Sequence, residues 1–82
     1  MSNKELQNLK KLVEIVGILR SPEGCPWDRE QNHMTLRENL LEETYEALEA
    51  IEADDPKMLR EELGDVLLQV VLHAQIAEEA GQ

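Results

Sequence analysis

Aromatic residues are nearly missing from this sequence, which has no phenylalanine, one tryptophan and one tyrosine among its 82 residues. Apolar residues still make up 41% of the chain, so a core must be built from Leu, Val, Ile and Ala, and this composition favours helices. A domain of this size buries only about 60% of the surface that its unfolded chain exposes. We therefore expect an all-α helical bundle that is completed by oligomerisation.

Cysteine and basic residues are also scarce. Cys25 is the only cysteine, which excludes an internal disulfide and argues against a cysteine-based zinc site. Eight basic residues against 18 acidic ones give a net charge of −10, which argues against binding to a nucleic acid polymer but allows a phosphate-bearing small molecule that arrives with a divalent cation. No stretch reaches the roughly 18 apolar residues of a membrane span, and the first residues lack the apolar run of a signal peptide. We expect a cytoplasmic protein without a membrane partner.

The first helix is predicted from about Asn3 to Arg20. Ser2 and Glu5 have the spacing of a capping box, and apolar residues then recur every three or four positions. This pattern is typical of an amphipathic packing helix. No chemically distinctive group stands out in it.

Residues 21–28 contain two prolines and a glycine, which predict a structured loop rather than a continuous helix. Trp27 either plugs the core or offers a flat surface to a ring, and its position next to Pro26 favours the plug. Cys25 fits a small buried filler better than a nucleophile, because no neighbouring residue marks it as activated.

Two further helices are predicted, and they should form a central antiparallel hairpin. Thr35 and Glu38 form a second capping box, and the helix that follows should end near Ala53. The next helix should begin after the cap Asp55 and run over residues 56–81. With so short a connection, the inner faces of the two helices come together.

The last helix carries a polar stripe on an otherwise apolar rod. At about 100° per residue, Glu62, Asp65, Gln69 and His73 fall within a sector of about 80°, and apolar residues surround them. Such a helix must be buried, and buried carboxylates are costly unless something such as a cation compensates them. A single histidine in this place is more typical of a hydrogen-bonded core or interface residue than of a metal ligand.

The preceding helix adds Glu42, Glu43 and Glu46, which lie within about 100° of one another, with Glu43 at the border of the apolar face. An ExxE on one helix and an ExxD on the next are oxygen-only ligands, which suit Mg²⁺ or Mn²⁺. The alternative for any acidic residue at helical spacing is a solvated face, and this alternative fits the remaining glutamates. Those glutamates are Glu49, Glu52, Glu61, Glu78 and Glu79.

Three motifs resemble the MazG-type nucleoside triphosphate pyrophosphohydrolases. They are Gly-Cys-Pro-Trp-Asp at residues 24–28, Glu-Glu-x-x-Glu at 42–46 and Glu-Glu-Leu-Gly-Asp at 61–65, in the order of the family. The resemblance covers nearly everything from Leu19 to Ala77. It implies an all-α fold shared with dimeric dUTPases and phosphoribosyl-ATP pyrophosphohydrolases. We expect this protein to work as a homodimer or a dimer of dimers.

The same resemblance implies Mg²⁺-dependent hydrolysis of a nucleoside triphosphate to a monophosphate and diphosphate, in the service of nucleotide-pool housecleaning. It assigns the catalytic positions to Glu42 and Glu43, where Glu42 is an auxiliary ligand or the group that orients or deprotonates the attacking water. Trp27 would stand as a lid or wall beside the substrate base. The metal positions carried over by motif are Glu43, Glu46, Glu62 and Asp65.

The family pattern continues past this last helix into another helix and a basic segment, whereas the sequence stops at Gln82. We therefore expect a single MazG-like helical domain over residues 1–82, which is either a fragment, a truncated paralogue or a minimal version that borrows residues from a partner subunit. The eight basic residues are scattered and form no evident phosphate cradle. The alternative function is a non-catalytic helical homo-oligomeric module that keeps the fold and lacks a complete phosphate site.

Overall fold

The computed structural model describes all 82 residues and contains four helices and no strand, which confirms the predicted all-α class. In chain order the helices are α1 (Asn3–Leu19), α2 (Pro26–Glu30), α3 (Arg37–Glu52) and α4 (Pro56–Glu79).

Two of the predicted helix starts carry the side-chain caps that the sequence indicates. The Glu5 backbone N–H donates to Ser2 Oγ over 3.2 Å at the start of α1. The Met58 N–H donates to Asp55 Oδ1 over 3.1 Å at the start of α4, where Pro56 occupies the first turn. Each cap satisfies a backbone donor that has no partner within its helix.

The segment that was expected to be a loop contains the short helix α2. Pro26 stands in its first turn, where a missing N–H costs nothing, and Cys25 precedes it as a cap without a side-chain hydrogen bond. The prolines and the glycine do interrupt the chain between α1 and α2, as predicted. The error was to extend that interruption across Trp27 and Asp28.

The predicted capping box of Thr35 and Glu38 is wrong. Helix α3 begins at Arg37, and its N-cap residue Leu36 makes no side-chain capping bond. Thr35 belongs instead to a preceding turn, in which its N–H donates to Asn32 Oδ1 over 2.9 Å and its Oγ1 accepts from the Asn32 N–H over 2.9 Å. Asn32 therefore takes the local hydrogen bonds that the capping box would have required.

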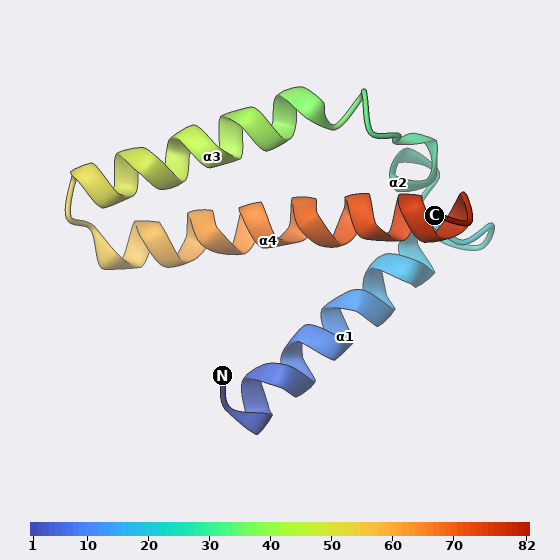
Figure 1. Ribbon diagram of the computed structural model, residues 1–82, viewed down its shortest axis with the longest axis horizontal. Coiled ribbons are helices and arrows are strands. Elements are labelled where there is room, and N and C mark those ends of the chain that lie inside the picture. The colour runs from blue at the N-terminus through green and yellow to red at the C-terminus, as the bar shows by residue number, and fades with distance from the viewer.

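Helices α3 and α4 lie side by side and run antiparallel, as Figure 1 shows. Residues 53–55 connect them, and Asp54 adopts φ +53°, a left-handed conformation that Asp tolerates. Helix α1 meets α4 near the C-terminal end of α4 and diverges from it toward the N-terminus (Figure 1).

The hydrophobic core is small and lies where α1, the start of α3 and the second half of α4 meet. Val16 and Leu36 are fully buried, and Val71 and Leu72 are nearly so. Leu12 and Ile76 pack against this group. Farther along the hairpin, Ala47 and Ala50 are the buried residues of α3.

The expectation that α4 is buried on nearly every side is wrong for the single chain. Leu63 is 50% exposed and Val70 is 55% exposed, because α1 and α3 cover only part of the helix. The apolar face of α3 is likewise open, with Tyr45 59% exposed. No helix has both the length and the apolar character needed to span a membrane. The chain thus presents more apolar surface than a small monomer usually leaves uncovered.

Candidate metal centre

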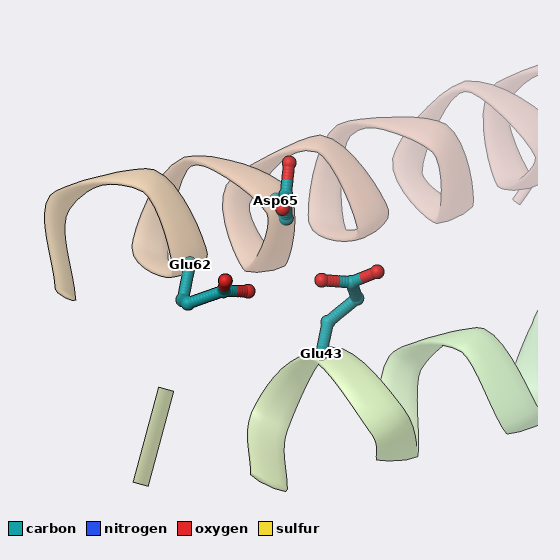
Figure 2. Close-up of side chains that lie close together, drawn as sticks. All are labelled: Glu43, Glu62 and Asp65. Carbon is teal, nitrogen blue, oxygen red and sulfur yellow. The ribbon is translucent and has the colours of Figure 1, made fainter. Parts of the chain in front are cut away.

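The hairpin brings acidic residues of α3 and α4 together. Glu43 extends from the middle of α3 toward α4, and Glu62 and Asp65 stand on successive turns in the first half of α4 (Figure 2). Each of the three side chains offers a carboxylate oxygen, and these oxygens all lie within 4.8 Å of one another. We call this group the carboxylate cluster.

The cluster has no positive charge to balance it. The only ion pair of the chain joins Arg20 and Glu79, and it involves none of these residues. Glu43 Oε2 and Glu62 Oε2 are buried and have no hydrogen-bond partner. Buried carboxylate oxygens without a donor are unfavourable, so the cluster is incomplete as a purely protein arrangement.

The pKa shifts in the cluster have the sign expected of crowded carboxylates. Burial raises the pKa of Glu43 above its ordinary value, and the charges of Asp65 and Glu46 raise it further. A hydrogen-bonding contact with the Glu46 carboxyl raises the pKa of Glu62 to about 7, with burial and the neighbouring charges adding to the effect. Like charges that must share a site resist ionising together. Without a cation, the cluster therefore holds protons at a pH where isolated carboxyls would be ionised.

Glu46 and Glu42 occupy different places relative to the cluster. Glu46 is exposed and lies outside the three-oxygen group, but its contacts with Glu62 and Glu43 place it beside the cluster. Glu42 is also exposed and supplies no oxygen to the group. Of the four residues predicted to hold a metal, three converge and the fourth borders them.

The donor set fits a hard divalent cation. It consists of carboxylate oxygens from two helices, without nitrogen or sulfur, and one oxygen each of Glu43 and Glu62 lacks a hydrogen-bond partner. Mg²⁺ and Mn²⁺ prefer such ligands and complete their coordination with water or phosphate oxygens. A cation would also remove the repulsion that raises the two pKa values.

Trp27 is 57% exposed, so the prediction that it plugs the core is wrong for this chain. Trp27 belongs to α2, which lies near the C-terminal end of α4 (Figure 1), whereas Glu62 and Asp65 of the carboxylate cluster belong to the first half of α4. The Trp27 carbonyl accepts a hydrogen bond from Gln31 Nε2 over 3.0 Å. The second interpretation of Trp27, a flat surface for a ring, is compatible with this exposure.

Arg20 has a structural role that the sequence did not indicate. It is 8% exposed, and its Nε and Nη2 donate to the two carboxylate oxygens of Glu79 over 2.9 and 3.1 Å. Its Nη1 donates to the carbonyls of Asp28 and Gln31 over 2.5 and 2.9 Å. Arg20 therefore ties the end of α1 to α2 and to the end of α4. No local motif links positions 59 residues apart, so no sequence signal could have found this pair.

Comparison with known proteins identifies the family. The family model for the MazG nucleotide pyrophosphohydrolase domain matches residues 31–82. The chain belongs to the MazG family. The predicted resemblance to this family is thereby confirmed, and the matched residues include the acidic motifs at 42–46 and 61–65.

Curated MazG-family relatives extend the match to most of the chain. The nucleoside triphosphate pyrophosphohydrolase/pyrophosphatase MazG of Thermotoga maritima is 60% identical over 72 residues, which are 88% of this chain and 28% of that protein. The nucleoside triphosphate pyrophosphohydrolases of Escherichia coli and Mycobacterium tuberculosis are 50% and 47% identical over 94% and 100% of this chain. These matches cover 30% and 26% of the two proteins. The chain thus spans less than a third of the length of these relatives.

Proposed function

We propose that this protein hydrolyses nucleoside triphosphates to nucleoside monophosphates and diphosphate with the help of a divalent cation, and so serves in nucleotide-pool housecleaning. The observation that carries the proposal is the carboxylate cluster, whose oxygens converge within 4.8 Å without an ion pair to a basic side chain, in a chain of the MazG family. The names of its relatives as nucleoside triphosphate pyrophosphohydrolases support the same reaction.

The cation would be Mg²⁺, with Mn²⁺ as a substitute, held by Glu43, Glu46, Glu62 and Asp65. When bound, it supplies neutralisation of the phosphate charge and a lower pKa for water in its shell. Glu42 stands one residue from Glu43 and is exposed, so it is available to orient the attacking water and accept its proton. Water attacks the α-phosphorus, the bond from this phosphorus to the bridging oxygen breaks, and diphosphate leaves.

The proposal includes a homodimer, or a dimer of dimers. The uncovered apolar residues of α3 and α4 offer a self-complementary surface on a chain too small to bury them alone. Trp27, with its exposed indole, would form a wall beside the base, either within one chain or across the interface. A reducing, cytoplasmic compartment suits the unpaired Cys25 and the nucleotide substrate.

The test is diphosphate release from a panel of ribo- and deoxyribonucleoside triphosphates, read as phosphate in the presence of an inorganic pyrophosphatase, with and without Mg²⁺. Glu62→Gln and Asp65→Asn should abolish turnover while the assembly state stays intact. Glu61→Gln is the matched control, because Glu61 is an exposed neighbour outside the carboxylate cluster. Turnover that needs no cation, or that survives both changes, refutes the site. Normal assembly without turnover of any nucleotide would favour the non-catalytic helical module.

A further inference from the structure

The polar stripe of α4 continues past the carboxylate cluster to two side chains that have no use in the reaction described above. Gln69 and His73 stand one and two turns beyond Asp65 on the same side of the helix. Gln69 is 7% exposed and its Oε1 has no hydrogen-bond partner. His73 Nε2 is also buried without a partner.

Both ends of this stripe meet the α3 side of the hairpin. At one end Glu62 and Asp65 meet Glu43 of α3. At the other end His73 meets His33, in the turn that leads into α3. Gln69 lies between these two contacts, so the two partnerless atoms and the carboxylate cluster lie along one line of the fold.

His33 leaves His73 with a single free nitrogen. The two Nδ1 atoms are 2.7 Å apart, and the rings are parallel within 5° with centroids 4.9 Å apart. A hydrogen bond between two imidazole nitrogens needs one donor and one acceptor, so only one proton lies between them. Burial, and then the charge of His33, lowers the pKa of His73 and so favours the neutral form of its ring. Nε2 is therefore the atom through which His73 can meet a ligand.

Buried polar atoms of native proteins are nearly always hydrogen-bonded, and partnerless ones indicate a missing partner. The two atoms suit a neutral hydrogen-bonding partner better than a charged one. An amide oxygen accepts hydrogen bonds, and a neutral imidazole carries no charge, so neither compensates phosphate oxygens. Helical rise places Gln69 about 6 Å and His73 about 12 Å beyond Asp65 along α4. A nucleoside whose α-phosphate lies at the carboxylate cluster would extend over this span.

We propose that Gln69 and His73 bind the nucleoside of the substrate, with Gln69 Oε1 accepting from a base N–H or a sugar hydroxyl and His73 Nε2 bonding to the base edge. This inference rests on the proposed function, since it assumes that the phosphates occupy the carboxylate cluster. It divides the stripe of α4 into an acidic half for the cation and phosphates and a neutral half for the nucleoside. His33 is a positioning residue, because it acts on the ligand only through His73.

The test measures binding rather than turnover, by calorimetry in the presence of Mg²⁺. The probes are nucleoside triphosphates with a methylene bridge between the α and β phosphorus atoms, and inorganic tripolyphosphate, which has no nucleoside. Gln69→Met keeps the length of the side chain and removes its amide. It should lower the affinity for the nucleotide probes about 10- to 100-fold and change the affinity for tripolyphosphate less than about twofold. Gln75→Met makes the same change on the same helix away from the stripe and should alter neither probe.

His73→Phe is the second variant, and it keeps the proposal testable if Gln69→Met does not fold. It should show the same selective loss, while circular dichroism reports an unchanged helical content. Probes with the four bases and with ribose or deoxyribose show whether the lost hydrogen bond was made to the base or to the sugar. If the variant loses the preference of the wild type among bases, the bond was made to the base. If it loses a preference for ribose, the bond was made to the sugar.

The proposal would be overturned if the folded variants bind tripolyphosphate and nucleotides equally more weakly than the wild type, or if neither affinity changes. The outcome is separable from that of the proposed function. A wild-type protein that binds the nucleotide probes more tightly than tripolyphosphate but turns over no nucleotide would refute the enzyme, while the variants still decide whether Gln69 and His73 contact the nucleoside. A wild-type protein that binds both probes equally refutes the nucleoside site directly.

Discussion

Replacing Arg20 with methionine should cost more stability than any other single polar change outside the core. Arg20 is 8% exposed, and its guanidinium makes four hydrogen bonds, two to the Glu79 carboxylate and two to the backbone carbonyls of Asp28 within α2 and Gln31 just after it. Methionine retains much of the apolar stem and removes every donor. The change therefore isolates the polar contacts from the packing of the side chain.

The magnitude follows from the groups left behind. Removing one partner of a buried ion pair costs about 3–5 kcal/mol, but the Glu79 side chain is 38% exposed and recovers part of this through hydration. The carbonyls of Asp28 and Gln31 lose their donor at about 1 kcal/mol each. We expect a total near 3 kcal/mol, which for a domain of this size corresponds to roughly 15 °C in melting temperature. This is a large share of the 5–15 kcal/mol that a typical domain has.

The measurement is urea denaturation followed by far-UV circular dichroism at neutral pH, with Glu79→Gln as the matched control. Glu79→Gln keeps the shape of the partner and leaves the two carbonyl bonds of Arg20, so it should cost only about 1 kcal/mol. The hydrogen bond from Arg20 holds the pKa of Glu79 below its ordinary value. The wild-type protein should therefore lose this contribution as pH falls through the folded-state pKa of Glu79, and Arg20→Met should lack that loss. An Arg20→Met midpoint within about 0.5 kcal/mol of the wild type would refute the reasoning.

Three further predictions concern the carboxylate cluster and the backbone. Asp65→Asn should weaken Mg²⁺ binding at least about tenfold in calorimetry and raise the melting temperature without cation, because it removes a repelling charge; unchanged affinity would exclude Asp65 as a ligand. Since the pKa of Glu62 rises from 4.5 to about 7 on folding, cation-free stability should increase as pH falls from about 7 toward 4.5, and Glu62→Gln should flatten that slope. A wild-type melting temperature that rises with pH in this window contradicts the shift. Gly24→Ala should cost more than about 2 kcal/mol, because its Cβ would collide with the carbonyl oxygens of Ile18 and Leu19, whereas Gly64→Ala, with no atom within 4 Å, should stabilise α4 by up to about 1 kcal/mol; equal thermal shifts in the two variants would argue against the collision.

The starts of α1 and α4 could be predicted because an N-cap is a hydrogen bond between neighbours in the chain. Ser2 and Asp55 each accept from the N–H three residues on, and no distant residue competes for them. Thr35 does not cap α3, because Asn32, which lies as close in the chain as Glu38, takes its hydrogen bonds. Spacing alone does not rank two local partners against each other.

The carboxylate cluster could be predicted from helical spacing and a short connection, because these two features fix which faces of α3 and α4 meet. Spacing does not set how far each carboxylate reaches, and so Glu46 borders the cluster while Glu43 joins it. The contact of Arg20 with Glu79 depends on where two distant helix ends meet, and the sequence carries no local mark of it. The exposure of Trp27 likewise depends on how α2 lies against its neighbours.

The error about the burial of α4 bears on how cation and assembly are coupled. The sequence describes a rod that is apolar around its polar stripe, and the single chain leaves Leu63, Leu67 and Val70 41–55% exposed. Even with this partial solvent exposure, burial and the neighbouring carboxylates raise the pKa values of Glu43 and Glu62. A second copy that covers the apolar residues would remove more water from the same helix, which makes uncompensated carboxylates costlier and a bound cation more favourable. By linkage the reverse also holds, so in the proposed homodimer a bound cation and the interface would stabilise each other.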